Sequence, residues 1–254
     1  ADLKGKKIAC ALGWPSNTLL AKTLEAGELT ETDVKILPMG DPSAAKIAFL
    51  TGNVDATVVW SPDDVVCLES RPSRILTSTE TMPNIIMDGF IARKDVLEKK
   101  HDDFIKLCKA WLVANSEMKN ENNMKEAAQV YKVAFGVEDD VSTILDGMKK
   151  IHFATYGDNL NFFGLSTDFT GITGQMLYNK MARVYKNGYN NNLKDIVPWS
   201  DASYPKIVQD ITGLVGSAHE AEGQVQFAPA DNKTASAAAI ATKRITVNFE
   251  TNSY

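Results

Sequence analysis

The sequence predicts an α/β fold built on a parallel sheet. A compact apolar run at residues 7–12 lies between Gly5 and Gly13, which is typical of a buried strand between two turns. A second run, at residues 56–60, is rich in β-branched side chains and also indicates a strand. Strand-like and helix-like segments alternate between these two runs, and that order favours parallel strands joined by helices.

The elements follow in order along the chain. We expect the first helix at residues 18–26, with Ser16 or Asn17 as its N-cap, because either side chain can accept a hydrogen bond from a free backbone amide. Asp41 is expected to cap a later helix. The other predicted strands are at residues 34–38 and 75–77, and the other predicted helices at residues 42–50, 63–69, 96–118, 123–135, 141–148, 173–186 and 204–215.

Composition excludes several functional classes. The chain has 254 residues, of which 44% are hydrophobic and 23% charged, enough for a substantial core. Its net charge of −5 argues against binding nucleic acid, because such proteins usually carry a basic surface. The apolar runs are shorter than the roughly 20 residues that span a bilayer.

The cysteines and histidines indicate no metal site. Cys10, Cys67 and Cys108 lie in apolar stretches without CxxC spacing, so we interpret them as buried thiols. One disulfide between two of these cysteines, with the third thiol free, is the alternative. The three histidines are separated from one another and from the cysteines, which excludes the usual zinc spacings.

The strongest candidate site is the turn from Gly13 to the start of the first predicted helix. Unpaired amides and the helix dipole at such a terminus favour an anion. Ser16, Asn17 and Thr18 add polar side chains at the same place. The alternative is an ordinary helix start without a ligand.

Two tryptophans stand beside this turn in the predicted sheet. Trp14 and Trp60 each follow the carboxyl end of a predicted strand, where open α/β sheets bind their ligands. They could form a wall for an organic group or a cation, with Ser61 as a weaker candidate. Packing of the two rings is the alternative.

Two further segments are candidates farther along the chain. Asp88 and Gly89 interrupt the apolar run at residues 85–92, where a glycine suits a bend or a hinge, and Asp88 could also touch a ligand. Asn161 belongs to a polar and aromatic cluster that we expect to be a loop, and a binding role is one interpretation of it. Packing of the aromatic residues in that cluster is the other.

Four stretches carry a resemblance to a known family: DLKGKKI, LGWPSNTLL, KIAFLTGNVDATVVWSP and GFIARKDVLEKKHDDFIKLCKAWL. Over residues 2–215 the chain resembles periplasmic solute-binding proteins of ABC transporters of the nitrate, taurine and aliphatic-sulfonate type. The resemblance implies a two-lobed periplasmic-binding-protein-like (type 2) fold. Residues 1–88 would be the second lobe and residues 89–215 the helical carboxyl part of the first. Family members have further chain before the lead-in, so the N-terminal half of the first lobe is expected to be absent here.

The end of the sequence differs in character. Residues 216–243 are rich in Ala, Gly, Ser, Asn and Gln, which predicts a linker. The ending KRITVNFETNSY resembles the first strand of an OmpA-like domain, so residues 244–254 are expected to open such a domain. This resemblance implies a tether in the cell envelope and peptidoglycan as a partner.

Together these features predict the solute-binding component of an ABC-type importer. It would bind a small anionic solute (phosphate, a sulfonate, nitrate or an organic acid) between two lobes in the periplasm, deliver it to a permease and need no cofactor. The alternative is a structural or interaction protein of the bacterial envelope that reuses the fold. The fold family also includes thiamine pyrimidine-precursor synthases that use a histidine. His101, His152 and His219 lie outside the predicted cleft and no catalytic motif occurs, so an enzyme is not expected.

Overall fold

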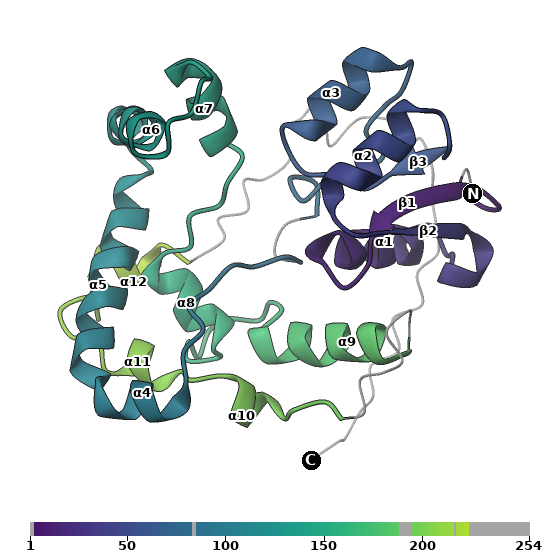
Figure 1. Ribbon diagram of the computed structural model, residues 1–254. Helices are drawn as coiled ribbons and strands as arrows, with labels where there is room; N and C mark the ends of the chain where they lie inside the picture. Colours follow the sequence, from purple (N-terminus) through teal and green to yellow (C-terminus); the bar gives the residue numbers. More distant parts are fainter. Residues whose placement is uncertain (1–2, 83–84, 188–194, 216, 224–254) are drawn as a thin grey trace, which may run out of the picture. The chain divides into compact units, whose positions relative to one another are not determined.

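The computed structural model describes residues 3–82, 85–187, 195–215 and 217–223 (Figure 1). The chain divides into two units, residues 1–223 and residues 224–254, and the second unit lies outside the described residues. The expected OmpA-like strand at residues 244–254 and most of the expected linker at residues 216–243 therefore lie outside them as well. Within the described residues, no helix has the length and apolar character needed to cross a membrane.

The described strands form one parallel sheet, as the sequence predicts. Strands β1 (Lys7–Ala11), β2 (Lys35–Met39) and β3 (Ala56–Thr57) lie in the order β2-β1-β3. Ile8 is paired with Ile36 on one side and with Ala56 on the other. β3 is shorter than the predicted strand at residues 56–60: after Val58 donates to the Ala9 carbonyl, the chain leaves the sheet. This early exit carries Trp60 to the start of the first helix.

Helices cover both faces of this sheet. Ile8 and Cys10 of β1 point to one face and pack in a core with α1 (Pro15–Ala26). Ala9 points to the other face and packs with α2 (Pro42–Leu50) and α3 (Asp63–Ser70). A short 3-10 helix, Glu31–Asp33, precedes β2. Figure 1 shows α2 and α3 on the side of the sheet away from α1. Because successive side chains of β1 point to opposite faces of the sheet, β1 contributes to a core on each face.

The described residues from 94 onward form helices joined by irregular segments, and they have a core of their own. Leu112, Tyr156, Val208, Ile211 and Leu214 are its buried members. The helices are α4 (Lys94–Lys99), α5 (His101–Glu117), α6 (Glu121–Phe135), α7 (Val141–Met148), α8 (Tyr156–Phe162), α9 (Gly174–Asn187), α10 (Trp199–Ala202), α11 (Lys206–Gln209) and α12 (Ala218–Ala221).

Helix caps and local backbone geometry explain which of the predicted element bounds agree with the structure. Helix α2 has the predicted bounds, and the Asp41 side chain accepts from the amide of Ala44 as expected. Helix α7 also has the predicted bounds, with Asp140 as its cap. The predicted helix at residues 96–118 is wrong as a single element, because the chain leaves helical geometry at Lys100 and divides into α4 and α5. Residues 75–77 form no strand.

Two more predictions need correction. The cluster around Asn161 is a helix, α8, and not a loop, because Thr155 and Asp158 form a capping box at its start. The predicted helix at residues 204–215 shrinks to α11, and Gly213 beyond it adopts a positive φ of 80° that ends helical geometry. In addition, residues 217–223 of the expected linker form α12 and its flanks, which pack against α8.

Candidate functional site

The candidate site begins at the turn between β1 and α1. Gly13 has a φ of 79°, a conformation that glycine adopts without strain, and it turns the chain out of the sheet. Trp14 is the N-cap residue in extended geometry, and Pro15 takes the first helical position. The expectation that Ser16 or Asn17 caps the helix is wrong: both lie inside the first turn, and no side chain caps α1. Pro15 has no N–H, and the Asn17 amide donates to the Trp14 carbonyl over 2.9 Å, so side chains more than backbone amides decide what this turn can bind.

Three successive polar side chains are buried in this first turn. Ser16, Asn17 and Thr18 are exposed by only 1%, 5% and 6%. Burying polar groups is unfavourable unless each finds a hydrogen-bond partner. The partners of these three residues therefore decide what the turn can bind.

Ser16 is held by a tryptophan from the end of β3. Trp60 Nε1 donates to Ser16 Oγ over 3.0 Å, so the Ser16 hydroxyl keeps its own proton for a further acceptor. The ring of Trp60 meets that of Trp14 edge to face, with centroids 6.1 Å apart. Both rings remain nearly half exposed, at 46% and 42%. The structure thus brings Trp14, Ser16 and Trp60 together.

Asn17 has a side-chain nitrogen without a partner. Its Nδ2 is buried and makes no hydrogen bond within the part of the chain that the structure describes. Leaving a buried donor unpaired costs about 1–3 kcal/mol, so such groups are rare unless a ligand or water completes them. Asn17 therefore offers two unused N–H donors in the same helical turn as the Ser16 hydroxyl.

Thr18 has its partner in the helical part of the chain. Tyr185 of α9 lies with its Oη 2.7 Å from Thr18 Oγ1, and the same hydroxyl donates to the Trp14 carbonyl over 3.2 Å. Sequence reasoning did not name Tyr185 as a functional residue. It stands among several aromatic and apolar residues of an amphipathic helix, and nothing in the sequence sets it apart from them.

A cluster of ion pairs lies at the other end of α1. Glu25 pairs with Lys22 at 2.7 Å and with Lys180 of α9 at 2.9 Å. Hydrogen bonds from Lys22 first, and then from Lys180, hold the pKa of Glu25 below its usual range. The groups that meet at the start of α1 are neutral hydroxyls, an amide and an indole, so an anion there would rely on neutral donors and on the helix dipole.

The other predicted site residues are either exposed or hydrogen-bonded elsewhere in the chain. Ser61 follows Trp60 directly and is exposed. Asp88 and Gly89 are exposed residues of the irregular segment between α3 and α4. Asn161 lies on α8, where its Nδ2 donates to the Gly223 carbonyl over 2.6 Å, so its amide is occupied by the chain itself.

The histidines and cysteines have structural partners. His101 pairs with Asp210 at 2.7 Å and His152 with Asp158 at 3.1 Å. His219 lies 3.4 Å from Glu222, again in the helical part. All three cysteines are free thiols, which answers the question of a disulfide. Burial above all raises the pKa of the Cys10 thiol to about 12, so this thiol stays protonated.

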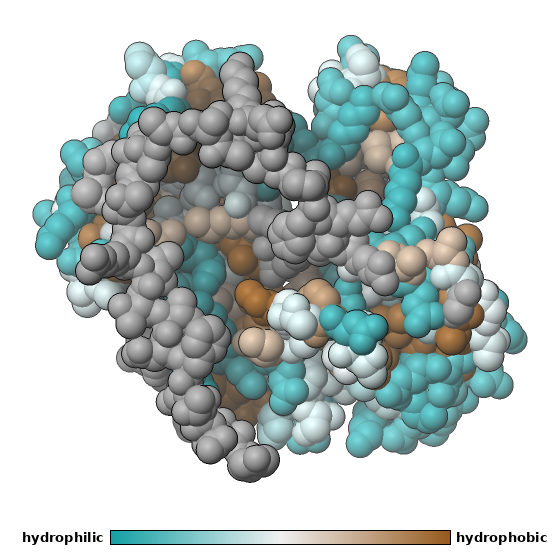
Figure 2. Space-filling model, turned by 180° about the vertical axis from the view of Figure 1, so that it is seen from behind, coloured by the Kyte–Doolittle hydropathy of each residue, from teal (hydrophilic) through white to brown (hydrophobic). Residues whose placement is uncertain are grey.

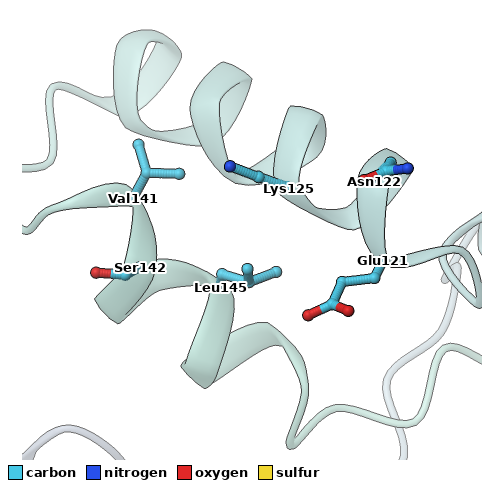
Figure 3. A pocket seen from close by; sticks show the side chains of 6 residues that line it. All are labelled: Glu121, Asn122, Lys125, Val141, Ser142 and Leu145. Carbon is cyan, nitrogen blue, oxygen red and sulfur yellow. The ribbon is translucent and has the colours of Figure 1, made fainter.

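A surface groove between α6 and α7 is a separate feature. Figure 3 shows Glu121, Asn122 and Lys125 on one side and Val141, Ser142 and Leu145 on the other. Glu121 is already paired with Lys149 at 2.8 Å. The groove offers no unpartnered buried polar group, so we assign the candidate site to the start of α1.

Comparison with known proteins identifies related sequences. Over 62 residues the chain is 42% identical to a protein of Escherichia coli (strain K12) named for binding aliphatic sulfonates, which covers 24% of this chain and 19% of that protein. Over 100 residues it is 31% identical to a binding protein of Brucella abortus (strain 2308), which covers 38% of this chain and 31% of that protein. The chain thus spans less than a third of these relatives.

Solved structures show the same fold. The periplasmic sulfonate-binding protein of an ABC transporter from Methylobacillus flagellatus KT matches with a TM-score of 0.54 at 23% identity, covering 75% of this chain and 55% of that one. The periplasmic aliphatic sulphonate binding protein of Escherichia coli matches with a TM-score of 0.55 at 19% identity, covering 82% and 65%. The α/β fold predicted from the sequence is therefore confirmed as that of periplasmic binding proteins, with part of their length represented.

The family model described as NMT1/THI5 like matches residues 1–127, which include the sheet, Trp14, Trp60 and the whole of α1. Half of the chain is covered by this match, and the candidate site begins inside it. The chain belongs to the NMT1/THI5-like family.

Proposed function

We propose that this chain is part of the solute-binding component of an ABC-type importer and that it binds a small organic anion at the start of α1. The observation that carries the proposal is the buried Asn17 amide without a partner, next to a Ser16 hydroxyl whose proton is free. A ligand oxygen that accepts from both groups would remove the cost of the unpaired donor.

The chemistry of the site favours an oxyanion with an organic group. Neutral donors at a helix terminus suit a weakly basic anion that keeps its charge near neutral pH, as a sulfonate does. The exposed parts of Trp14 and Trp60 offer apolar surface beside the donors, which suits an alkyl or aryl substituent. A sulfonate fits both features. The relatives named for binding sulfonates support the same solute class.

The proposal extends to location and partners. A solute-binding protein of this kind would work in the periplasm and deliver its solute to a permease, with Asp88 and Gly89 as the hinge between lobes 1–88 and 89–215. The OmpA-like ending and a peptidoglycan partner stay predictions from residues 244–254. Binding without turnover is part of the proposal, because the three histidines are engaged with acidic partners away from α1.

Calorimetry on the natural full-length protein tests this function. We would titrate short alkanesulfonates, nitrate, phosphate and small carboxylates, with an alkylammonium salt of equal chain length as the control. We expect saturable binding of at least one anion and none of the ammonium salt. The paired variant Ser16→Ala/Asn17→Ala should abolish that binding. An anion bound equally well by this variant would contradict the site, and failure of every anion to bind would contradict the function.

A further inference from the structure

Tyr185 joins the helical part of the chain to the candidate site. We propose that Tyr185 is a positioning residue of this site. Its hydroxyl fixes the turn before α1 so that Ser16 and Asn17 face the solute, and it couples solute binding to the docking of α9 on α1. This inference rests on the proposed function and adds a residue and a coupling that the function alone does not require.

The protons of the hydroxyl groups can be assigned one by one. The Trp14 carbonyl can only accept, so the single proton of Tyr185 goes to it. Thr18 must then donate its own proton to Tyr185 Oη over the 2.7 Å contact. The Thr18 hydroxyl therefore has no proton left for a solute, whereas Ser16 and Asn17 do.

This assignment divides the buried polar residues into two roles. Ser16 and Asn17 supply donors to the anion, and Thr18 anchors Tyr185. Thr18 thus contributes to binding without touching the solute. The Trp14 carbonyl is fixed at the same time, and Trp14 is the N-cap residue that sets the direction of the amides of α1.

A second contact shows how α9 lies along α1. Lys180 pairs with Glu25 at the end of α1, while Tyr185 reaches the start of α1. The order of these contacts means that the two helices run antiparallel. The Lys180 pair is half exposed, so it contributes little energy, and the partly buried contact of Tyr185 with the buried Thr18 is the stronger link. Movement of α9 would free the Thr18 hydroxyl and leave the Trp14 carbonyl bonded to the Asn17 amide, which donates to it over 2.9 Å.

The test compares two tyrosines of the same helix. Tyr185→Phe removes the hydroxyl at the site, and Tyr178→Phe removes a hydroxyl that donates to the Val197 carbonyl over 2.7 Å elsewhere on α9. Affinity for the anion that the unsubstituted protein binds best would be measured by calorimetry. Backbone amide exchange of residues 14–20 would be followed with and without that anion.

We expect Tyr185→Phe to weaken binding by about tenfold, because two hydrogen bonds are lost. It should also speed amide exchange in residues 14–20, and solute should no longer protect α9. Tyr178→Phe should bind as the unsubstituted protein does. Equal affinity of the two tyrosine variants would overturn the inference while leaving the proposed function intact.

A second pair of variants separates anchoring from direct contact. Thr18→Val keeps the size of the side chain and removes its hydroxyl. If Thr18 acts through Tyr185, the double variant Thr18→Val/Tyr185→Phe should bind no more weakly than the weaker single variant. Losses that add would mean that Thr18 contacts the solute itself and would overturn the assignment. If the unsubstituted protein binds no anion, the proposed function fails and this inference fails with it.

Discussion

At the scale of single residues, Asn17 is the clearest sign of a site. Most buried polar side chains in a folded protein are paired, and Asn17 keeps an unpaired Nδ2 within a helix that could easily hold an apolar residue there. An unpaired amide lowers the stability of the protein without solute, so we expect one only where solute binding needs the donor. Stability and function should therefore respond in opposite directions when Asn17 is replaced.

Replacing Asn17 by leucine tests this opposition. Asn17→Leu keeps the branching at Cγ and removes the unpaired amide, so we expect the free energy of unfolding without solute to rise by about 1 kcal/mol. Anion binding should be lost in the same variant. Urea denaturation and calorimetry measure the two effects.

A paired asparagine on another helix is the control. Asn159 Nδ2 donates to the Thr155 carbonyl over 2.8 Å, so Asn159→Leu should lower the free energy of unfolding by about 1 kcal/mol and leave binding intact. A loss of stability in Asn17→Leu equal to that of the control would show that the Asn17 amide is satisfied in the empty protein.

At the scale of elements, side-chain caps and glycines set where helices begin and end. Helices α2 and α7 match the sequence prediction because an aspartate cap precedes each of them. The polar and aromatic residues around Asn161 predict a loop instead of helix α8, although Thr155 and Asp158 have the spacing of a capping box. The cap was the better signal, since it satisfies amides that a loop would leave to solvent.

The ion pair at the start of α8 predicts a pH dependence. The hydrogen bond with Asp158 raises the pKa of His152 above 6.5. Burial pushes the pKa of Asp158 upward, but the hydrogen bonds from His152 and Thr155 outweigh it and leave this pKa below 3.8. The stability from His152 is therefore complete below pH 6.5 and is lost as pH rises through its raised pKa. The stability from Asp158 is lost as pH falls through its lowered pKa.

Thermal unfolding of the unsubstituted protein and of His152→Gln should show this window. We expect the unsubstituted protein to be more stable by at most about 0.5 kcal/mol at pH ~5.5, since the His152 side chain is largely exposed. The difference should shrink toward pH ~8.5, where His152 is neutral. A difference that grows with pH would contradict the pairing.

We expect replacement of glycine by alanine to have opposite effects on stability at two positions. Gly136 ends α6 with a φ of 61°, so Gly136→Ala should destabilise the protein by about 1 kcal/mol. Gly147 lies inside α7 and its added Cβ would meet open space, so Gly147→Ala should stabilise it by about 0.5–1 kcal/mol. Denaturation midpoints of both variants measure the difference, and the same sign for both would contradict these helix bounds.

At the scale of the whole molecule, the described residues are organised around separate cores. The sheet has one core on each face, and the helical residues have a third core formed by α5, α8 and the segment after α10. Figure 2 shows hydrophobic patches among hydrophilic residues on the face seen from behind. Exposed apolar side chains include Trp111 of α5 and Val133 of α6.

A contact between two glycines holds the end of the described chain to the helical core. A Cβ added to Gly157 would lie 2.4 Å from the amide nitrogen of Gly223, so a side chain cannot be accommodated without separating the segments. We expect Gly157→Ala to destabilise α8 and α12 by more than about 1 kcal/mol. Amide exchange should rise there and stay unchanged in β1, because β1 belongs to other cores. Gly147→Ala is the control. Faster amide exchange in β1 of the Gly157→Ala variant would show that the cores unfold together.

The sequence by itself determined the local elements and the family resemblance. The alternation of β1, the aspartate cap of α2 and the glycine turn at Gly13 depend on neighbouring residues, so periodicity and turn chemistry could predict them. The same reasoning placed Trp14 and Trp60 at one edge of the sheet, because carboxyl ends of parallel strands meet there.

Only the tertiary structure decided the partners of the buried polar groups. Ser16 and Trp60 are 44 residues apart, and Thr18 and Tyr185 are 167 residues apart, so no local pattern connects them. The same is true of Asn161, whose amide is taken by Gly223, 62 residues away. Hydrogen-bond satisfaction depends on what folding brings within about 3 Å, and this is why the unpaired amide of Asn17 and the role of Tyr185 appear only in the folded chain.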